Sequence, residues 1–303
     1  MLTPPRGVTL VELLVTLGLM AIVSTAIYRV VVNSQRAYQA ETQRIDLQQN
    51  LRAAATILSA ELRELDASDG DLVALSPTSL TIRATRQLAF LCAVPVIGVP
   101  IAGTVGATLT IRQDPFYGAR DFNSATDSIF IFYEGDPGTP GDDGWVRGRL
   151  NADPTPLRCA DGAPGRHVST QLLFQTNQIA RTGRISGGSP VRGFEPVTYA
   201  LYLAADGRWY LGAHSGSSGG VRQPLVGPLS GAAGVTFEYL AANGAATAVA
   251  AQVALIRFIV RARTAVPVRQ GGGGGPPEYV TDSITTTVSL RNNRRWDTSA
   301  PGS

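Results

Sequence analysis

Residues 6–14 of this chain read Arg-Gly-Val-Thr-Leu-Val-Glu-Leu-Leu, and they begin an apolar stretch that continues to about Val32. From Leu13 to Tyr28 the stretch contains no charged residue. Counted from Val8 to Tyr28 it is about 21 residues long, close to the roughly 20 that cross a bilayer as a helix. The N-terminal part of the chain is therefore predicted to form a membrane-spanning helix.

Glu12 is the unusual residue of this stretch. An unpaired carboxylate inside a membrane costs roughly 2.5–3.5 kcal/mol. We therefore expect Glu12 to have a functional role and a partner that neutralises its charge. A secretory signal peptide is one alternative, with residues 24–26 (Ser-Thr-Ala) as its cleavage site, and a simple signal anchor is another. Neither explains Glu12. Neither explains why the helical pattern continues past Ala26, with no Gly or Pro from Leu19 to Ser68.

Residues 7–12, Gly-Val-Thr-Leu-Val-Glu, resemble the cleavage and methylation motif of type IV prepilins. The family form of this motif is Gly, an apolar residue, Thr, Leu, a variable residue and Glu. The resemblance implies that a prepilin peptidase cuts after Gly7 at the cytoplasmic face and that residues 1–7 are a leader. It also implies N-methylation of Val8, which stands where the family more often has phenylalanine.

The chemistry of the residues agrees with this resemblance. Cleavage after Gly7 would free an α-amine on Val8, which has a reference pKa of roughly 7.7–8.0 and is largely cationic at neutral pH. Methylation keeps that charge. Because Glu12 lies about one helical turn away, an amine at Val8 of the same or a neighbouring subunit could neutralise it. We therefore expect Glu12 to pair with the Val8 amine of an adjacent subunit and to draw subunits into a filament.

The composition fits one membrane helix followed by one medium-to-large domain, since the chain has 303 residues, of which 44% are hydrophobic and 16% charged. The formal net charge of +3 would fall by one with the loss of Arg6, and it gives no case for a nucleic-acid partner. The cysteines, Cys92 and Cys159, would face an oxidising space beyond the membrane. A disulfide between them is favoured over two separate buried thiols. By closing a loop, it would stabilise the folded state by roughly 4 kcal/mol.

One continuous helix is predicted from Val8 to about Asp66, with a membrane-spanning part over residues 8–32 and an amphipathic part over residues 33–66. Apolar residues recur in the second part at helical spacing, which predicts packing against the C-terminal sheet of the same chain. They are Leu47, Leu51, Ala54, Leu58, Leu62 and Leu65.

Residues 67–303 are predicted to form a β-rich globular domain outside the membrane, because the apolar pattern changes there to short alternating runs. The run Ile129–Phe132 is apolar on both faces, which indicates a central strand. The predicted strands are Ser79–Ala84, Gln87–Val94, Ala107–Arg112, Ser128–Tyr133, Trp145–Leu150, Gln171–Phe174, Val197–Leu203, Trp209–Gly212, Val235–Tyr239, Val253–Arg263 and Tyr279–Leu290.

Shorter matches place the chain within the pilin family. Residues 47–52 and 58–63 resemble the helix of PilW-like minor pilins, and residues 285–292 resemble their last strand. Residues 234–239 followed by 253–257 resemble a strand pair that these proteins share with GspJ-type pseudopilins. The resemblance implies an α+β, type IV pilin-like fold, in which a long N-terminal helix packs on a C-terminal antiparallel β-sheet domain.

Enzymatic and metal-binding alternatives are weak, and no catalytic residue, cofactor or metal site is predicted. Residues 216–220 match the G-x-S-x-G motif, but that motif needs a strand before it and a helix after it, and the sequence that follows is of low complexity. His167 and His214 lack close ligand spacing with the cysteines. The aspartates Asp136, Asp142 and Asp143 lie in a Pro/Gly-rich segment that favours a solvated turn over a cation site.

The basic tail Arg291–Trp296 could touch phosphates, but such tails are usually only solvated, so nucleic acid is disfavoured as a partner. The leading prediction is a non-enzymatic minor pilin that helps to initiate or cap a type IV pilus. The implied partners are other minor and major pilins, the prepilin peptidase and the inner-membrane assembly platform. The implied location is the inner membrane, single pass with the N-terminus cytoplasmic, and then a pilus or pseudopilus. The alternatives are a minor pseudopilin of type II secretion, or a secreted hydrolase or binding protein cut after Ala26.

Overall fold

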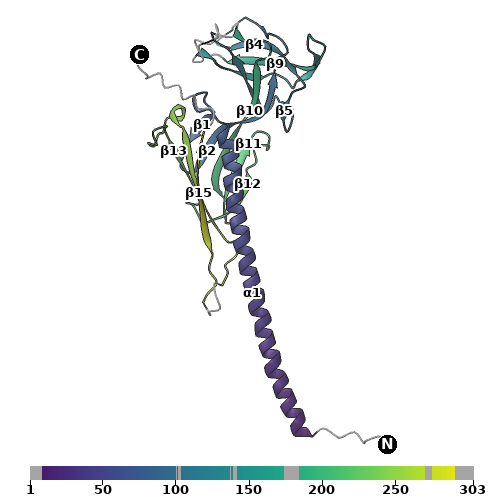
Figure 1. Cartoon of the computed structure of the whole chain (residues 1–303), viewed down its shortest axis with the longest axis vertical. Coiled ribbons are helices and arrows are strands. Elements are labelled where there is room, and N and C mark those ends of the chain that lie inside the picture. Colours follow the sequence, from purple (N-terminus) through teal and green to yellow (C-terminus); the bar gives the residue numbers. More distant parts are fainter. Residues whose placement is uncertain are drawn as a thin grey trace, which may run out of the picture.

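A computed structural model describes residues 9–99, 101, 104–136, 138, 142–173, 184–269 and 275–290. Within these residues the chain forms one long N-terminal helix, α1 (Leu10–Arg63), and a 15-stranded sheet in which every strand pairing is antiparallel. Figure 1 shows α1 as a rod whose C-terminal part lies against the strands, while its N-terminal part projects away from them. The predicted α+β class and the antiparallel sheet are confirmed.

The strands follow α1 in the order of the sequence. Their bounds are β1 (Leu72–Leu75), β2 (Ser79–Phe90), β3 (Val96–Ile97), β4 (Thr104–Arg112), β5 (Tyr117–Gly118), β6 (Ser128–Tyr133), β7 (Gly144–Leu150), β8 (Thr155–Arg158), β9 (Pro164–Leu173), β10 (Pro190–Leu203), β11 (Trp209–Ser215), β12 (Gln223–Leu229), β13 (Val235–Leu240), β14 (Leu255–Arg263) and β15 (Thr281–Ser289).

The helix-side lobe is built around the C-terminal part of α1, which packs against β12, β14 and β15. All six residues of the predicted apolar stripe are buried there, and the side chains of Leu58 and Leu62 are fully enclosed. Val288 and Leu290, near the end of the sheet, are buried in the same core. The prediction that the stripe packs on the C-terminal strands of the same chain is confirmed.

The distal lobe lies beyond the C-terminal end of α1 and has a separate core formed mainly by β4, β6, β7 and β9. Strand β6 runs between β10 and β7, so it is a central strand as predicted. Ile129 and Ile131 have no exposed surface on one face of β6, and Phe130 is 4% exposed on the other. Burial on both faces explains why this run lacks the polar alternation of an exposed strand.

Strands β2 and β10 run through both lobes. The prediction of two separate strands, Ser79–Ala84 and Gln87–Val94, was wrong, because β2 is continuous to Phe90. Gly193 pairs with Gln87 and Phe194 pairs with Thr85, which leaves Arg86 as an extra residue in a β-bulge. The bulge shifts the alternation by one residue. The same shift in the sequence also fits a turn between two strands, which is why the prediction failed here.

Other predictions also differ from the structure: β9 begins at Pro164 and not at Gln171, and β10 begins at Pro190 and not at Val197. Strand β12 was missed because it contains two prolines, yet it pairs with β11 over several residues and with β14 at its end. The helix was predicted to continue to Asp66, but it ends at Arg63. Asp66 instead organises the following turn, where its Oδ1 accepts hydrogen bonds from the backbone N–H of Ser68 at 2.9 Å and from its hydroxyl at 2.6 Å.

A buried polar network connects the two lobes. Glu195 on β10 is 1% exposed, and its Oε2 accepts a hydrogen bond from the hydroxyl of Ser217 at 2.9 Å. Arg120 lies 3.4 Å from the same carboxylate and pairs with buried Asp127 at 2.6 Å. Because a buried carboxylate without partners is strongly destabilising, these contacts are what allow two acids to occupy the boundary between the cores.

Candidate functional site at the N-terminal helix

The first turn of α1 positions Glu12. Thr9 is the N-cap residue, and its hydroxyl oxygen accepts a hydrogen bond from the backbone N–H of Glu12 at 3.3 Å. The pair has the Thr-x-x-Glu spacing of a capping box, of which this hydrogen bond to Thr9 is one half, and the sequence interpretation missed the motif although it was visible. The helix was predicted to begin at Val8 and is described from Leu10, while Gly7 and Val8 lie outside the described residues.

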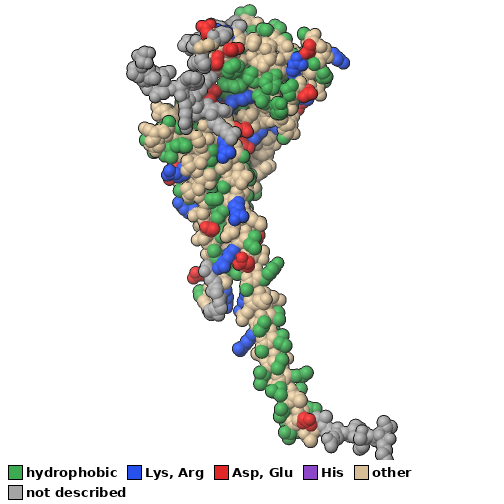
Figure 2. All heavy atoms as spheres, viewed as in Figure 1, with side chains coloured by type: hydrophobic (Ala, Val, Ile, Leu, Met, Phe, Trp, Pro, Cys, Tyr) green, Lys and Arg blue, Asp and Glu red, His purple; other side chains and the backbone are tan. Residues whose placement is uncertain are grey.

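The N-terminal part of α1 is an exposed apolar surface. Met20 is 70% exposed and Ile22 is 68% exposed, and the other large apolar side chains of this part are also solvent-accessible. Figure 2 shows hydrophobic side chains along the lower part of the rod. The helix is long and apolar enough to cross a membrane, and a signal sequence would satisfy the same criterion. A surface of this size needs a lipid or protein environment to cover it.

The polar groups of this part suit a membrane helix. The hydroxyl of Thr16 donates to the carbonyl of Leu13 at 2.9 Å, and that of Thr25 donates to the carbonyl of Ala21 at 2.8 Å. These hydroxyls are therefore satisfied within the helix, as a lipid environment requires.

The nearest charged residue after Glu12 is Arg29. The rise of an α-helix places the two residues roughly 25 Å apart along the axis. Because a bilayer core is about 30 Å thick, Glu12 would lie near one face of the membrane when Arg29 lies near the other.

Polar contacts fix the C-terminal part of α1 to the helix-side lobe. The Oε1 atom of Gln43 accepts a hydrogen bond from the backbone N–H of Ala265 at 3.1 Å. Asn50 donates to the carbonyl of Gly227 at 3.2 Å. The helix that precedes Gln43 projects from these contacts by roughly 50 Å, enough to span a membrane and leave the lobe outside it.

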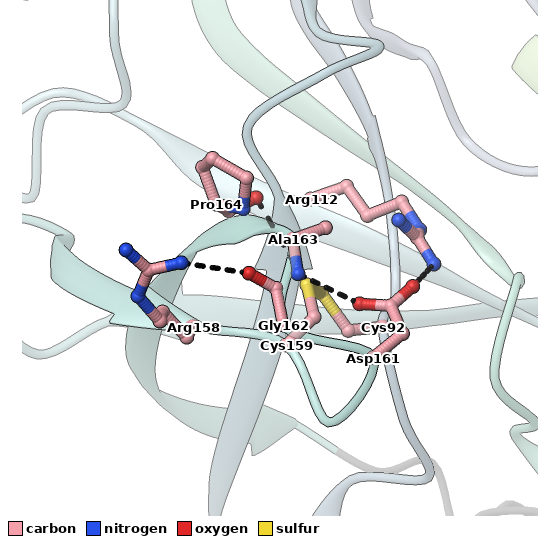
Figure 3. The surroundings of a disulfide bond; sticks show 8 residues. All are labelled: Cys92, Arg112, Arg158, Cys159, Asp161, Gly162, Ala163 and Pro164. Atoms are coloured by element: carbon pink, nitrogen blue, oxygen red, sulfur yellow. Dashed lines mark hydrogen bonds and ion pairs between the residues drawn. A yellow bond between two sulfur atoms is a disulfide. The ribbon is translucent and has the colours of Figure 1, made fainter.

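The disulfide between Cys92 and Cys159 is present, as the sequence favoured. It joins the segment that follows β2 to the turn between β8 and β9, and the two Cα atoms are 5.5 Å apart (Figure 3). Gly165 of β9 packs closely against the bridge, because a Cβ at that position would lie only 2.9 Å from the sulfur of Cys159. The bridge therefore links two segments of the distal lobe.

Hydrogen bonds hold the turn beside the disulfide (Figure 3). Arg158 donates to the carbonyl of Gly162 at 2.9 Å, and the backbone N–H of Ala163 donates to Asp161 at 3.1 Å. Arg112 forms an ion pair with Asp161, and its hydrogen bond holds the pKa of that carboxyl below the ordinary value. This arrangement is structural, since each polar group is directed at the turn itself.

The G-x-S-x-G match does not form a nucleophile elbow. Ser218 follows β11 as the motif requires, but a turn and then β12 come after it where the motif needs a helix. Its hydroxyl lies 2.7 Å from the carbonyl of Ser215, within the turn. Ser217, the preceding residue, is directed at Glu195 in the network between the lobes.

The aspartates of the Pro/Gly-rich segment accept backbone hydrogen bonds. Asp143 accepts one from Gly135, and Asp142 accepts one from Asp136, each at 2.8 Å. Arg184 pairs with Asp142 at 3.0 Å. The carboxylates therefore stabilise the turn, and among the described residues no group of three or more His, Cys, Asp or Glu side chains could hold a metal ion.

A comparison with known families matches residues 1–40 to a family described as the ATPase proteolipid family. The match covers the exposed apolar part of the helix and none of the sheet, so it does not assign the whole chain to that family. No curated protein and no solved structure matches the chain. The fold and the apolar helix thus define the class: an α+β protein that has, in the part of the chain described, one candidate membrane-spanning helix near its N-terminus.

Proposed function

We propose that this chain is a type IV pilin-like filament subunit, specifically a PilW-like minor pilin that helps to initiate or cap a pilus. The observation that carries the proposal is the division of a single helix of 54 residues, α1. Its first part is apolar and exposed, and its second part is packed on an antiparallel domain. In a subunit of this form, lipid covers the apolar surface before assembly, and the helices of neighbouring subunits can cover it afterwards.

Glu12 would fix the position along the filament at which each subunit packs against its neighbours. Glu12 lies in the first turn of α1, where its negative charge interacts favourably with the positive end of the helix dipole. Thr9 caps the same turn. After cleavage beyond Gly7, the amine of Val8 in a neighbouring subunit would neutralise Glu12 within the apolar bundle. Partners are then other minor and major pilins, with the prepilin peptidase and the assembly platform acting at the inner membrane.

The mature N-terminus tests the processing step. Mass spectrometry of the protein isolated from its host membrane should find a chain that begins at Val8, with or without a methyl group on its amine. A chain that begins at Ile27 would instead indicate a secreted protein cut by signal peptidase, and it would refute the proposal because Glu12 would be lost.

Two substitutions separate the charge of Glu12 from its place in the helix cap. Glu12→Gln keeps a residue that suits a capping box but removes the charge, whereas Thr9→Ala removes the capping hydroxyl and keeps the charge. We expect Glu12→Gln to be excluded from sheared filaments and Thr9→Ala to enter them. Equal incorporation of Glu12→Gln and the unmodified chain would show that charge pairing does not drive assembly. Deletion of the gene should remove surface pili; loss of protein secretion alone would favour the pseudopilin alternative.

A further inference from the structure

One face of the distal sheet carries arginines stacked on aromatic rings. In the register of β10, β6 and β7, Arg192 lies opposite Phe130, and Phe130 lies opposite Arg147. Directly opposed residues on neighbouring strands share a face, and so do residues two apart on one strand, which adds Arg149. The arginine-aromatic face is defined here by Arg83, Arg147, Arg149, Arg192, Phe130 and Trp145.

The contacts between these side chains are close. The guanidinium carbon of Arg192 lies 4.7 Å from the ring centre of Trp145 and 5.4 Å from that of Phe130. Arg83 lies 5.7 Å from the same Phe130 ring. Arg147 lies 6.0 Å from the ring centre of Phe194, which stacks on Phe130. The aromatic rings thus hold several guanidinium groups close together.

The positive charge of the face exceeds its negative charge. Arg192 forms an ion pair with Asp71 at 3.4 Å, and the charge of the same carboxylate also acts on Arg83, whose pKa it raises. Arg83 donates to the carbonyl of Gly70, which carries no charge. Burial, and then the positive charge of Arg147, lower the pKa of Arg83, so these two cations lie close enough to repel each other.

The outer part of the face is accessible. The side chains of Arg147 and Arg149 are exposed, and Trp145 is partly exposed beside them. The buried Nε of Arg192 has no hydrogen-bond partner within the described residues. Accessible arginines beside a partly exposed indole can bind phosphate groups and stack on an unpaired base, because a base can lie on an aromatic ring or on a guanidinium plane.

We propose that the arginine-aromatic face binds single-stranded nucleic acid, with phosphates on Arg147 and Arg149 and a base against Trp145. This inference goes beyond the filament role and does not depend on it. The net charge of the chain gave no case for a nucleic-acid partner. That sum does not show the local excess of arginines that the register of three strands brings together.

Binding can be measured with the full chain in a nonionic detergent and a fluorescein-labelled oligothymidylate, by anisotropy over a series of salt concentrations. The variant Arg147→Gln/Arg149→Gln should weaken binding by about tenfold and reduce the slope of log affinity against log salt by roughly 0.7 for each lost phosphate contact. The matched control is Arg52→Gln/Arg63→Gln, which removes two exposed arginines from α1 and should leave both quantities unchanged.

Three outcomes would overturn the proposal. One is an equal loss of affinity in the control variant, which would show general attraction by net charge. Another is loss of binding on deletion of residues 291–303 with no effect of Arg147→Gln/Arg149→Gln, which would place the contact in the C-terminal tail. The third is binding of heparin, an acidic polysaccharide, without binding of the oligothymidylate. Circular dichroism of each variant verifies that it is folded.

Discussion

The two parts of α1 are the same helix in two environments. Leu10 near its start is 76% exposed, whereas Leu58 near its end has no exposed surface. The first part is apolar nearly all round, and the second carries a single apolar stripe that covers the helix-side lobe. The apolar content of a helix alone therefore does not indicate what buries it. An apolar stripe indicates the chain's own core, and an apolar cylinder indicates a membrane or other helices.

The largest expected effect comes from the buried part of the helix. Leu58→Ala should lower the free energy of unfolding of the domain by about 2–5 kcal/mol, because it leaves a cavity in a closed core. The matched substitution in the exposed part, Leu14→Ala, should change it by less than about 0.5 kcal/mol. Urea unfolding of the full chain in detergent, followed by tryptophan fluorescence, measures both. Similar values for the two variants would contradict the division of α1 into an exposed and a packed part.

The disulfide extends the comparison to the two lobes. Removing it with Cys92→Ser/Cys159→Ser should destabilise the distal lobe by about 2–4 kcal/mol, since the bridge restricts the unfolded chain. Hydrogen exchange should accelerate in β4 and β9 and change little in β13 and β14, which lie in the other core. Equal acceleration in all four strands would show that the lobes unfold as one unit and that their separate cores are not separately stable.

A smaller effect is expected at the edge of the helix-side core. The hydroxyl of Tyr239 donates to the carbonyl of Ser76 at 2.9 Å, and burial raises the pKa of this phenol to about 12. Tyr239→Phe should cost about 1 kcal/mol of unfolding free energy because it leaves that carbonyl without its partner. Tyr210→Phe, which removes a more exposed hydrogen bond to Asp206, is the control and should cost less. A larger loss in the control would contradict this ranking.

The smallest effect is a pH dependence with opposite signs at two aspartates. Burial raises the pKa of Asp71 above 3.8, although Arg192 opposes the shift, so the folded state binds its proton more tightly than the unfolded state. The stability of the unmodified chain relative to Asp71→Asn should therefore fall as the pH rises from 3.8 through the folded pKa, and then stay level.

Asp142 provides the comparison for Asp71. The backbone N–H of Asp136 lowers the pKa of Asp142. Stability relative to Asp142→Asn should be fully present above 3.8 and should be lost as the pH falls through the folded pKa. Unfolding free energies measured across this range would contradict one of the two assignments if the two differences changed in the same direction.

The sequence predicted the features that repeat regularly. The stripe of α1 and the central strand β6 were both predicted, because helical spacing and a doubly apolar run each have one simple structural interpretation. The bulge at Arg86 was not predicted, since a one-residue shift in alternation looks the same whether the chain turns or continues. Strand β12 was missed because its prolines suggest a loop when the pairing partners are unknown.

The candidate sites differ in the same way. Glu12 and the cysteine pair could be found from sequence because a charge within an apolar run and two lone cysteines stand out locally. The arginine-aromatic face could not, because Arg83, Arg147 and Arg192 are far apart in the chain. Only the strand register brings them to one surface, and register depends on pairings that a single sequence does not specify.

The shared strands β2 and β10 have a mechanical consequence. Because each runs unbroken from one core into the other, the lobes are joined by paired backbone ladders and not by a flexible tether. Tension applied along α1 would reach the outermost strands as shear across many hydrogen bonds acting in parallel. The distal lobe would then keep its orientation relative to α1 under tension.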